Sequence, residues 1–91
     1  LNPAGEFVGG DVETQTRQVL ENVGAVLRSA GLTYNDVIKT TIFLTSMDHF
    51  AAVNKVYAEF FETQPPARST VAVAGLPRGV DVEIECLASF A

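Results

Sequence analysis

Apolar residues follow a helical spacing in two stretches of the chain. Between residues 12 and 30 they recur every three or four positions, with Asp11 placed to cap the helix start and Gly31 placed to stop it. A second stretch with the same spacing covers residues 48–62. The sequence therefore predicts two amphipathic helices, at 12–30 and 48–62.

Three strands are expected around the second helix. Residues 36–45 are rich in β-branched side chains and apolar on both faces, which is typical of a central strand. A second strand is expected at 69–75, and turn residues at 76–79 lead into an alternating strand from Val80 onward. Because a helix joins the first two strands, they should be parallel, and the short turn should pair the last strand antiparallel with the second.

This element order predicts an α+β sandwich in which both helices pack on one face of a mixed sheet. Ninety-one residues are enough for one domain with one core. The other sheet face carries Val, Phe and Leu with no helix left to cover it, so another subunit is its natural cover. Gly24 inside the first helix costs ~1 kcal/mol against Ala and is either neutral or a mark of close packing on the sheet.

Composition and charge exclude several classes of protein. The net charge is −5 and the six Lys and Arg residues are scattered, which argues against a nucleic-acid binder. One His and one Cys are too few for a tetrahedral metal site, and no glycine-rich phosphate loop is present, so a metal and many classes of cofactor are not expected. No apolar run approaches the ~18 residues that span a bilayer. The lone Cys86 is typical of a reducing compartment, and a cytoplasmic location is expected.

Arg68 is the first candidate for chemistry. It follows the helix-breaking pair Pro65 and Pro66 and precedes the second strand, so its guanidinium should be held where it can bind a carboxylate. Glu83 and Glu85 share one face of the last strand, roughly 6.8 Å apart, and the expected hairpin would bring Arg68 toward Glu85. The alternatives are a plain surface arginine and a cross-strand ion pair worth ~0.2–1 kcal/mol.

Asn54 is a second polar residue of interest, because it falls on the apolar face of the second predicted helix. It is either a satisfied polar group at an interface or a ligand contact. His49 has no Ser or Cys nucleophile nearby in the sequence pattern and is expected to be a surface residue.

Four blocks of the chain, at 36–44, 50–57, 66–71 and 82–85, form distinctive sequence motifs. They read Asp-Val-Ile-Lys-Thr-Thr-Ile-Phe-Leu, Phe-Ala-Ala-Val-Asn-Lys-Val-Tyr, Pro-Ala-Arg-Ser-Thr-Val and Val-Glu-Ile-Glu. In this order and spacing they closely resemble the RidA family, also called YjgF-like or L-PSP-like, of enamine/imine deaminases. The resemblance extends from Asn2 to Ala88, so the chain is expected to be a single RidA-like domain over residues 1–91.

The resemblance implies a chorismate-mutase-like fold assembled as a homotrimer, with active sites in the clefts between subunits. It also implies hydrolysis of 2-aminoacrylate and 2-iminobutanoate-type acids to 2-oxo acids and ammonia, without metal or cofactor. Arg68 matches the family's carboxylate-binding arginine, and Glu83 matches the glutamate taken to activate water. Thr70 matches a position whose backbone helps to bind substrate, and Asn54 matches an asparagine near the cleft.

Family members usually have a further N-terminal segment with Gly-Pro-Tyr and Ser-Gly-Gln motifs, which this sequence lacks. Either the sequence is a fragment or another chain supplies those residues. Two other functions stay open. One is the endoribonuclease or translation-inhibitor activity for which some relatives are named. The other is a trimeric regulatory module that binds a small acid without turnover.

Overall fold

The computed structural model describes residues 11–62 and 65–90. Its elements are α1 (Val12–Ser29), β1 (Val37–Leu44), α2 (Phe50–Phe60), β2 (Ala67–Ala72) and β3 (Val82–Ala88), with short 3-10 turns between them. The turn and short extended piece expected at 2–8 lie outside the described residues. None of the helices within the described ranges is long and apolar enough to cross a membrane.

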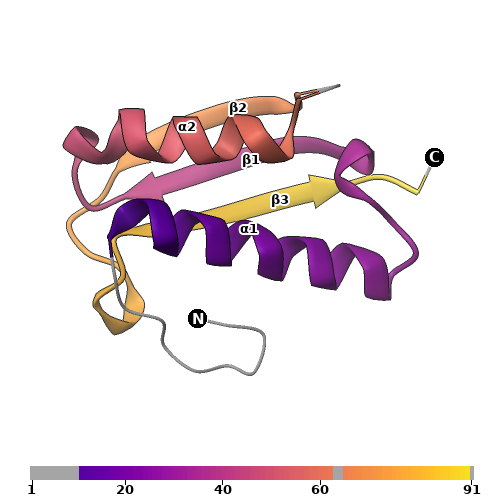
Figure 1. The fold of residues 1–91 in the computed structure, drawn as a ribbon, viewed down its shortest axis with the longest axis horizontal. Coiled ribbons are helices and arrows are strands. Elements are labelled where there is room, and N and C mark those ends of the chain that lie inside the picture. The colour runs from indigo at the N-terminus through magenta and orange to yellow at the C-terminus, as the bar shows by residue number, and fades with distance from the viewer. Residues whose placement is uncertain (1–10, 63–64, 91) are drawn as a thin grey trace.

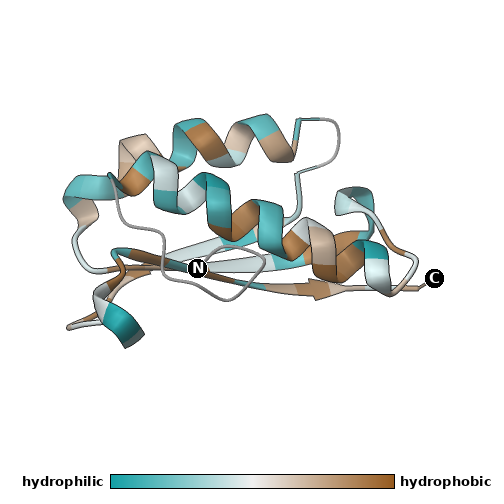
Figure 2. Ribbon diagram, turned by 60° about the horizontal axis from the view of Figure 1, so that its bottom comes forward, coloured by the Kyte–Doolittle hydropathy of each residue, from teal (hydrophilic) through white to brown (hydrophobic). Residues whose placement is uncertain are grey.

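The described elements form two layers. α1 and α2 lie side by side on one face of a three-stranded sheet (Figure 1). In Figure 2 both α-helices are on the same side of the sheet, and neither lies on the other side. The predicted α+β sandwich with both helices on one face is therefore confirmed.

The strand order is β2-β1-β3, with β2 parallel and β3 antiparallel to β1. The parallel pair and the central place of the first strand were predicted correctly, but the hairpin between the second and third strands was wrong. After β2 the chain crosses beyond the end of β1, where the Thr45 amide donates to the Asp81 carbonyl at 3.1 Å. β3 then pairs with the free edge of β1, so β2 and β3 are opposite edges of the sheet.

One face of β1 contributes to the core, and the other face is open. Thr40, Ile42 and Leu44 are buried under the helices, whereas Ile38 is 52% exposed. Strict alternation would place Ile38 on the same face as Thr40, but an irregularity in the pairing between Val37 and Lys39 shifts the alternation. Val37 points into the core in its place, at 4% exposure.

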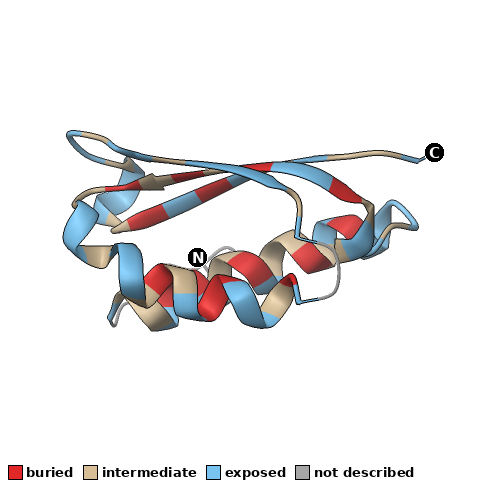
Figure 3. Cartoon of the chain, turned by 90° about the horizontal axis from the view of Figure 1, so that it is seen from above, coloured by how far each residue is buried: buried red, intermediate tan, exposed pale blue. Residues whose placement is uncertain are grey.

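The core lies between the helices and the sheet (Figure 3). Its buried apolar residues come from every layer: Leu20, Leu27, Val37, Ile42, Leu44, Val53, Val56, Tyr57, Phe61, Val82 and Ile84. Val26 follows the helical spacing of α1 but is 69% exposed, at the edge of that helix's apolar face. The alternation predicted for the last strand is confirmed within β3, whereas Phe90 beyond it is 80% exposed.

The ends of the elements show how local chemistry sets them. Asp11 caps α1 by accepting a hydrogen bond from the Thr14 amide at 2.8 Å, as predicted. Gly31 follows the helix end with φ +78°, a conformation that favours glycine. The second predicted helix begins later than expected, because a 3-10 turn at Met47–His49 precedes α2. β2 begins at Ala67, so Arg68 is a strand residue rather than part of the preceding turn.

Candidate functional site

Arg68 is held against the inner face of α2 by three side chains. Its Nη1 donates a short hydrogen bond to Asn54 Oδ1. The guanidinium carbon lies 5.0 Å from the centre of the Tyr57 ring and 5.7 Å from that of Phe50. Both distances are within the range in which a cation is attracted to an aromatic face. The guanidinium is therefore held in place, while its other N–H groups can still donate to a carboxylate.

Beside Arg68 is an open depression of about 510 Å³. It is lined by Asn54, Tyr57, Ala58, Phe61, Glu62, Pro65, Pro66 and Arg68. The lining combines apolar side chains with one cation, one amide and the carboxylate of Glu62. The cation can bind a small molecule that has a carboxylate at one end. The structure thus brings Arg68 and Asn54 together at one site, as the sequence suggested.

Thr70 is the next residue along β2 on the side of Arg68. Arg68 pairs with Thr40 of β1, and Thr70 pairs with Ile42, so both point toward the helix layer. Thr70 is partly buried, whereas Arg68 is exposed. Three of the four predicted site residues therefore share the helix side of the sheet.

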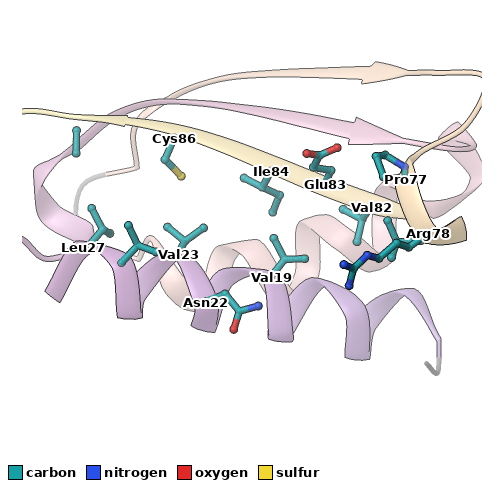
Figure 4. Close-up of a pocket in the computed structure, with 13 residues that line it drawn as sticks. Val19, Asn22, Val23, Leu27, Pro77, Arg78, Val82, Glu83, Ile84 and Cys86 are labelled. Atoms are coloured by element: carbon teal, nitrogen blue, oxygen red, sulfur yellow. The ribbon is translucent and has the colours of Figure 1, made fainter. Parts of the chain in front are cut away.

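Glu83 lies on the other side. Its neighbours Val82 and Ile84 are buried against the helices, so Glu83 points to the open face, across from Phe43 of β1. Figure 4 shows its carboxylate pointing away from α1, opposite to the Val82 and Ile84 side chains. Arg68 and Glu83 are therefore separated both by the sheet and by the width of β1.

The expected approach of Arg68 to Glu85 is wrong for the same reasons. Glu85 pairs with Thr41 on the open face, and β3 and β2 are two strand spacings apart, about 9.5 Å. On the helix side of the sheet, Arg68 pairs with Thr40 of β1, and Thr40 in turn pairs with Cys86 of β3. Cys86 is therefore the β3 residue in register with Arg68. Burial raises the pKa of the Cys86 thiol, which keeps the thiol protonated and therefore a poor nucleophile.

Tyr57 and Phe50 are parts of this arrangement that the sequence pattern did not identify. Both lie within the amphipathic helix predicted at 48–62, and Tyr57 is 4% exposed. Residues 50, 54 and 57 are four and three positions apart, which places them on one helix face. That spacing was the available signal that the two rings accompany Asn54.

A second groove, of about 520 Å³, follows the outer edge of β3 beside α1 (Figure 4). Its walls are mainly apolar, with Val19, Val23 and Leu27 from α1 facing Ile84 and Cys86 from β3. None of the residues that contact the Arg68 guanidinium lines it. Across the described residues, no three His, Cys, Asp or Glu side chains gather as metal ligands would.

Known proteins with similar sequences cover almost all of this chain. The family model described as Endoribonuclease L-PSP matches residues 1–90. The chloroplastic Reactive Intermediate Deaminase A of Arabidopsis thaliana is 48% identical over 86 residues, which are 94% of this chain and 46% of that protein. The 2-iminobutanoate/2-iminopropanoate deaminase of Mus musculus is 44% identical over 89 residues, or 97% of this chain and 66% of that protein.

The crystal structure of the YjgF gene product from E. coli has the same fold. It superposes with a TM-score of 0.93 at 44% identity, covering 99% of this chain and 73% of that one. The likeness confirms that the two-layer sandwich is of the chorismate-mutase-like type expected from the sequence. This chain spans between 46% and 73% of the lengths of these three proteins.

Proposed function

The chain belongs to the RidA (YjgF/L-PSP) family, as its motifs predicted, and on this premise we propose that it is an enamine/imine deaminase. The substrates would be small acids of the 2-aminoacrylate and 2-iminobutanoate type. The observation that carries the proposal is the Arg68 guanidinium, held by Asn54 and two aromatic rings beside an open depression. Such a cation is prepared to bind the carboxylate that every one of these substrates has.

In the proposed reaction the protein has two tasks, which are to bind the substrate carboxylate and to orient the water that attacks the substrate. Protonation of the enamine carbon gives the iminium form of the acid. Water then adds to the C=N carbon, and the resulting aminoalcohol loses ammonia to leave the 2-oxo acid. Arg68 would grip the substrate carboxylate with its free N–H groups, and the Thr70 backbone would add a contact. Glu83 would orient the water and take its proton.

Glu83 of the same chain faces the opposite side of the sheet, so we propose that a neighbouring copy supplies it. The open face presents the rows Ala67–Lys39–Leu87, Ser69–Thr41–Glu85 and Val71–Phe43–Glu83. Leu87 and Val71 are 58% and 42% exposed there, which favours burial against another subunit. A cyclic trimer packed through this face would carry one composite site at each interface. The proposed setting is the cytoplasm, where a lone cysteine stays reduced.

Replacing Arg68 tests the carboxylate contact. Hydrogen bonds to a charged group are worth about 1.5–3 kcal/mol each, so Arg68→Ala should raise KM for enzymatically generated 2-aminoacrylate by about two orders of magnitude. Arg17→Ala removes another exposed arginine, which lies on α1 and pairs with Glu59, and should leave the activity unchanged. Unchanged hydrolysis by Arg68→Ala would refute the assignment.

A mixing experiment tests whether the site is composite. At a substrate concentration near the wild-type KM, Arg68→Ala and Glu83→Gln should each be nearly inactive alone. When they are unfolded together and refolded in equal amounts, roughly a quarter of the interfaces of random trimers would combine an intact Arg68 with an intact Glu83. Activity should return to about that fraction. Two inactive variants that stay inactive after mixing would place both residues of the site in one chain.

The two other functions are tested on the same sample. The net charge of −5 counts against an endoribonuclease, and RNA cleavage that persists through repurification and disappears in Arg68→Ala would support one. A regulatory module would bind 2-oxobutanoate in a titration but would not turn over 2-aminoacrylate.

A further inference from the structure

Tyr57 connects the Arg68 guanidinium to the core of the protein. Its ring lies 5.0 Å below the guanidinium carbon, and its hydroxyl is 2.7 Å from Thr40 Oγ1. Tyr57 and Thr40 are 4% and 1% exposed, so the hydrogen bond between them is buried. A tyrosine that supports a surface cation on one side is thus anchored to the central strand on the other.

The anchor point is directly beside the cation. Thr40 is the residue of β1 that pairs with Arg68 of β2. If the Tyr57 ring tilted away from Arg68, the buried Thr40 hydroxyl would lose its partner, at the cost of a desolvated polar group. The Phe61 ring packs against Tyr57 with centres 4.7 Å apart and restricts the ring from another direction.

The protonation state of Tyr57 suits this role. Burial raises the pKa of its hydroxyl above the ordinary value, and the Thr40 hydrogen bond and the Arg68 charge offset only part of that shift. The hydroxyl therefore stays neutral at physiological pH and remains a hydrogen-bonding partner for Thr40. A neutral ring supports the cation without forming an ion pair that would compete with a bound carboxylate.

Arg68 gains from this support because it is exposed. An unsupported arginine at a strand edge samples many rotamers and must lose that freedom when it binds a carboxylate. Asn54 fixes only the Nη1 end of the Arg68 guanidinium, and the Tyr57 ring restricts the orientation of the guanidinium plane. Together they leave the remaining N–H groups in a single orientation.

We propose that Tyr57, anchored by Thr40, is a positioning residue that sets the orientation in which Arg68 binds the substrate carboxylate. This role rests on the proposed function, because it supposes that Arg68 binds an acid. If the role is correct, replacing Tyr57 should change two measurable properties: the affinity for a carboxylate ligand and the mobility of the Arg68 side chain.

The test compares two substitutions of Tyr57 with a control in the same helix. Tyr57→Leu removes the ring and should weaken 2-oxobutanoate binding about 3- to 30-fold, with a raised KM and a nearly unchanged kcat. Tyr57→Phe keeps the ring and should recover the affinity to within about threefold. Val56→Ala truncates a fully buried neighbour that does not line the depression beside Arg68, and the affinity of this variant should equal that of the wild type.

A second readout does not depend on the ligand. The ¹⁵N relaxation of the Arg68 Nε–H group should report a rigid side chain in the wild type and a mobile one in Tyr57→Leu. Tyr57→Phe keeps the ring but loses the hydrogen bond to Thr40, so it should increase the mobility only slightly. Thr40→Val removes the same hydrogen bond from the other side and should increase the mobility by a similarly small amount. If Tyr57→Leu folds, keeps its affinity and keeps Arg68 rigid, the positioning role is wrong.

The two readouts also separate this inference from the proposed function. A wild-type protein that neither binds 2-oxobutanoate nor turns over 2-aminoacrylate would defeat the proposed function, whatever the relaxation data show. A wild-type protein that is active, with a Tyr57→Leu variant of equal affinity, would defeat the positioning role alone. Should Tyr57→Leu fail to fold, Thr40→Val with its relaxation readout decides the question.

Discussion

Replacing Gly24 by alanine should destabilise this protein, although the same change stabilises most helices. Glycine in a helix interior usually costs about 0.5–1 kcal/mol relative to alanine, so removing it is normally favourable. At Gly24 an added Cβ would lie 2.7 Å from Cζ of Tyr34, closer than real Cβ contacts come. Gly24 thus marks close packing, as one of the sequence-based alternatives supposed, but against Tyr34 and not against the sheet.

The contacts that Tyr34 would lose set the size of the effect. Its hydroxyl donates to the Leu20 carbonyl oxygen at 2.5 Å, and a hydrogen bond of this kind contributes about 0.5–1.5 kcal/mol. Its ring packs edge-on against Phe60 and Phe61, with centres 5.6 Å apart in both pairs, and each such contact contributes about 0.5–1.5 kcal/mol. After the gain in helix propensity is subtracted, we expect a net loss of about 1–3 kcal/mol.

Urea unfolding followed by far-ultraviolet circular dichroism, at one protein concentration, measures this change. The matched control is the same substitution in a Tyr34→Ala background. There the obstacle is gone, so Gly24→Ala should raise the free energy of unfolding by about 0.5–1 kcal/mol. The sign of the effect therefore depends on Tyr34. If Gly24→Ala stabilises the protein equally in both backgrounds, the packing explanation is refuted.

Two further predictions concern pH and assembly. The hydrogen bond from the Thr14 backbone amide holds the pKa of the Asp11 carboxyl below its ordinary value. The cap therefore stabilises the fold fully above the ordinary pKa of an aspartate, and the stabilisation is lost as the pH falls through the lowered pKa. Asp11→Asn keeps a capping side chain and should therefore flatten an acid titration of stability followed by circular dichroism; an unaltered titration would count against the cap as its source. On the open face, Leu87→Arg should shift sedimentation velocity toward the monomer, whereas Val26→Arg on α1, at a similarly exposed apolar residue, should not. Equal behaviour of the two variants would contradict assembly through the sheet face.

Features set by neighbouring residues could be predicted from the sequence. The Asp11 cap and the Gly31 stop define α1 through contacts within one turn, and the alternation of β3 follows from its own side chains. The parallel pairing of β1 and β2 follows from the helix between them. Each of these depends on a short stretch of chain, which is why the pattern was sufficient.

The strand order could not be predicted in this way, because it depends on contacts far apart in the sequence. Residues 76–79 have turn chemistry, and a turn next to two strands suggests a hairpin. In the structure Asp81 instead contacts two distant residues, because it accepts hydrogen bonds from the Gln15 side chain at 3.1 Å and from Thr45 Oγ1 at 3.3 Å. These contacts with α1 and the end of β1 direct the chain to the far edge of the sheet.

The separation of Arg68 from Glu83 follows from the core itself. Side chains alternate along a strand, so the burial of Val82 and Ile84 requires Glu83 to face the open side. A register shift of β3 by one residue would turn Glu83 toward the helices, but it would also expose both of those core residues. Arg68 is held on the helix side by Asn54 and Tyr57. Because the contacts that stabilise the fold keep the two groups on different faces, a site that uses both requires a second copy of the chain.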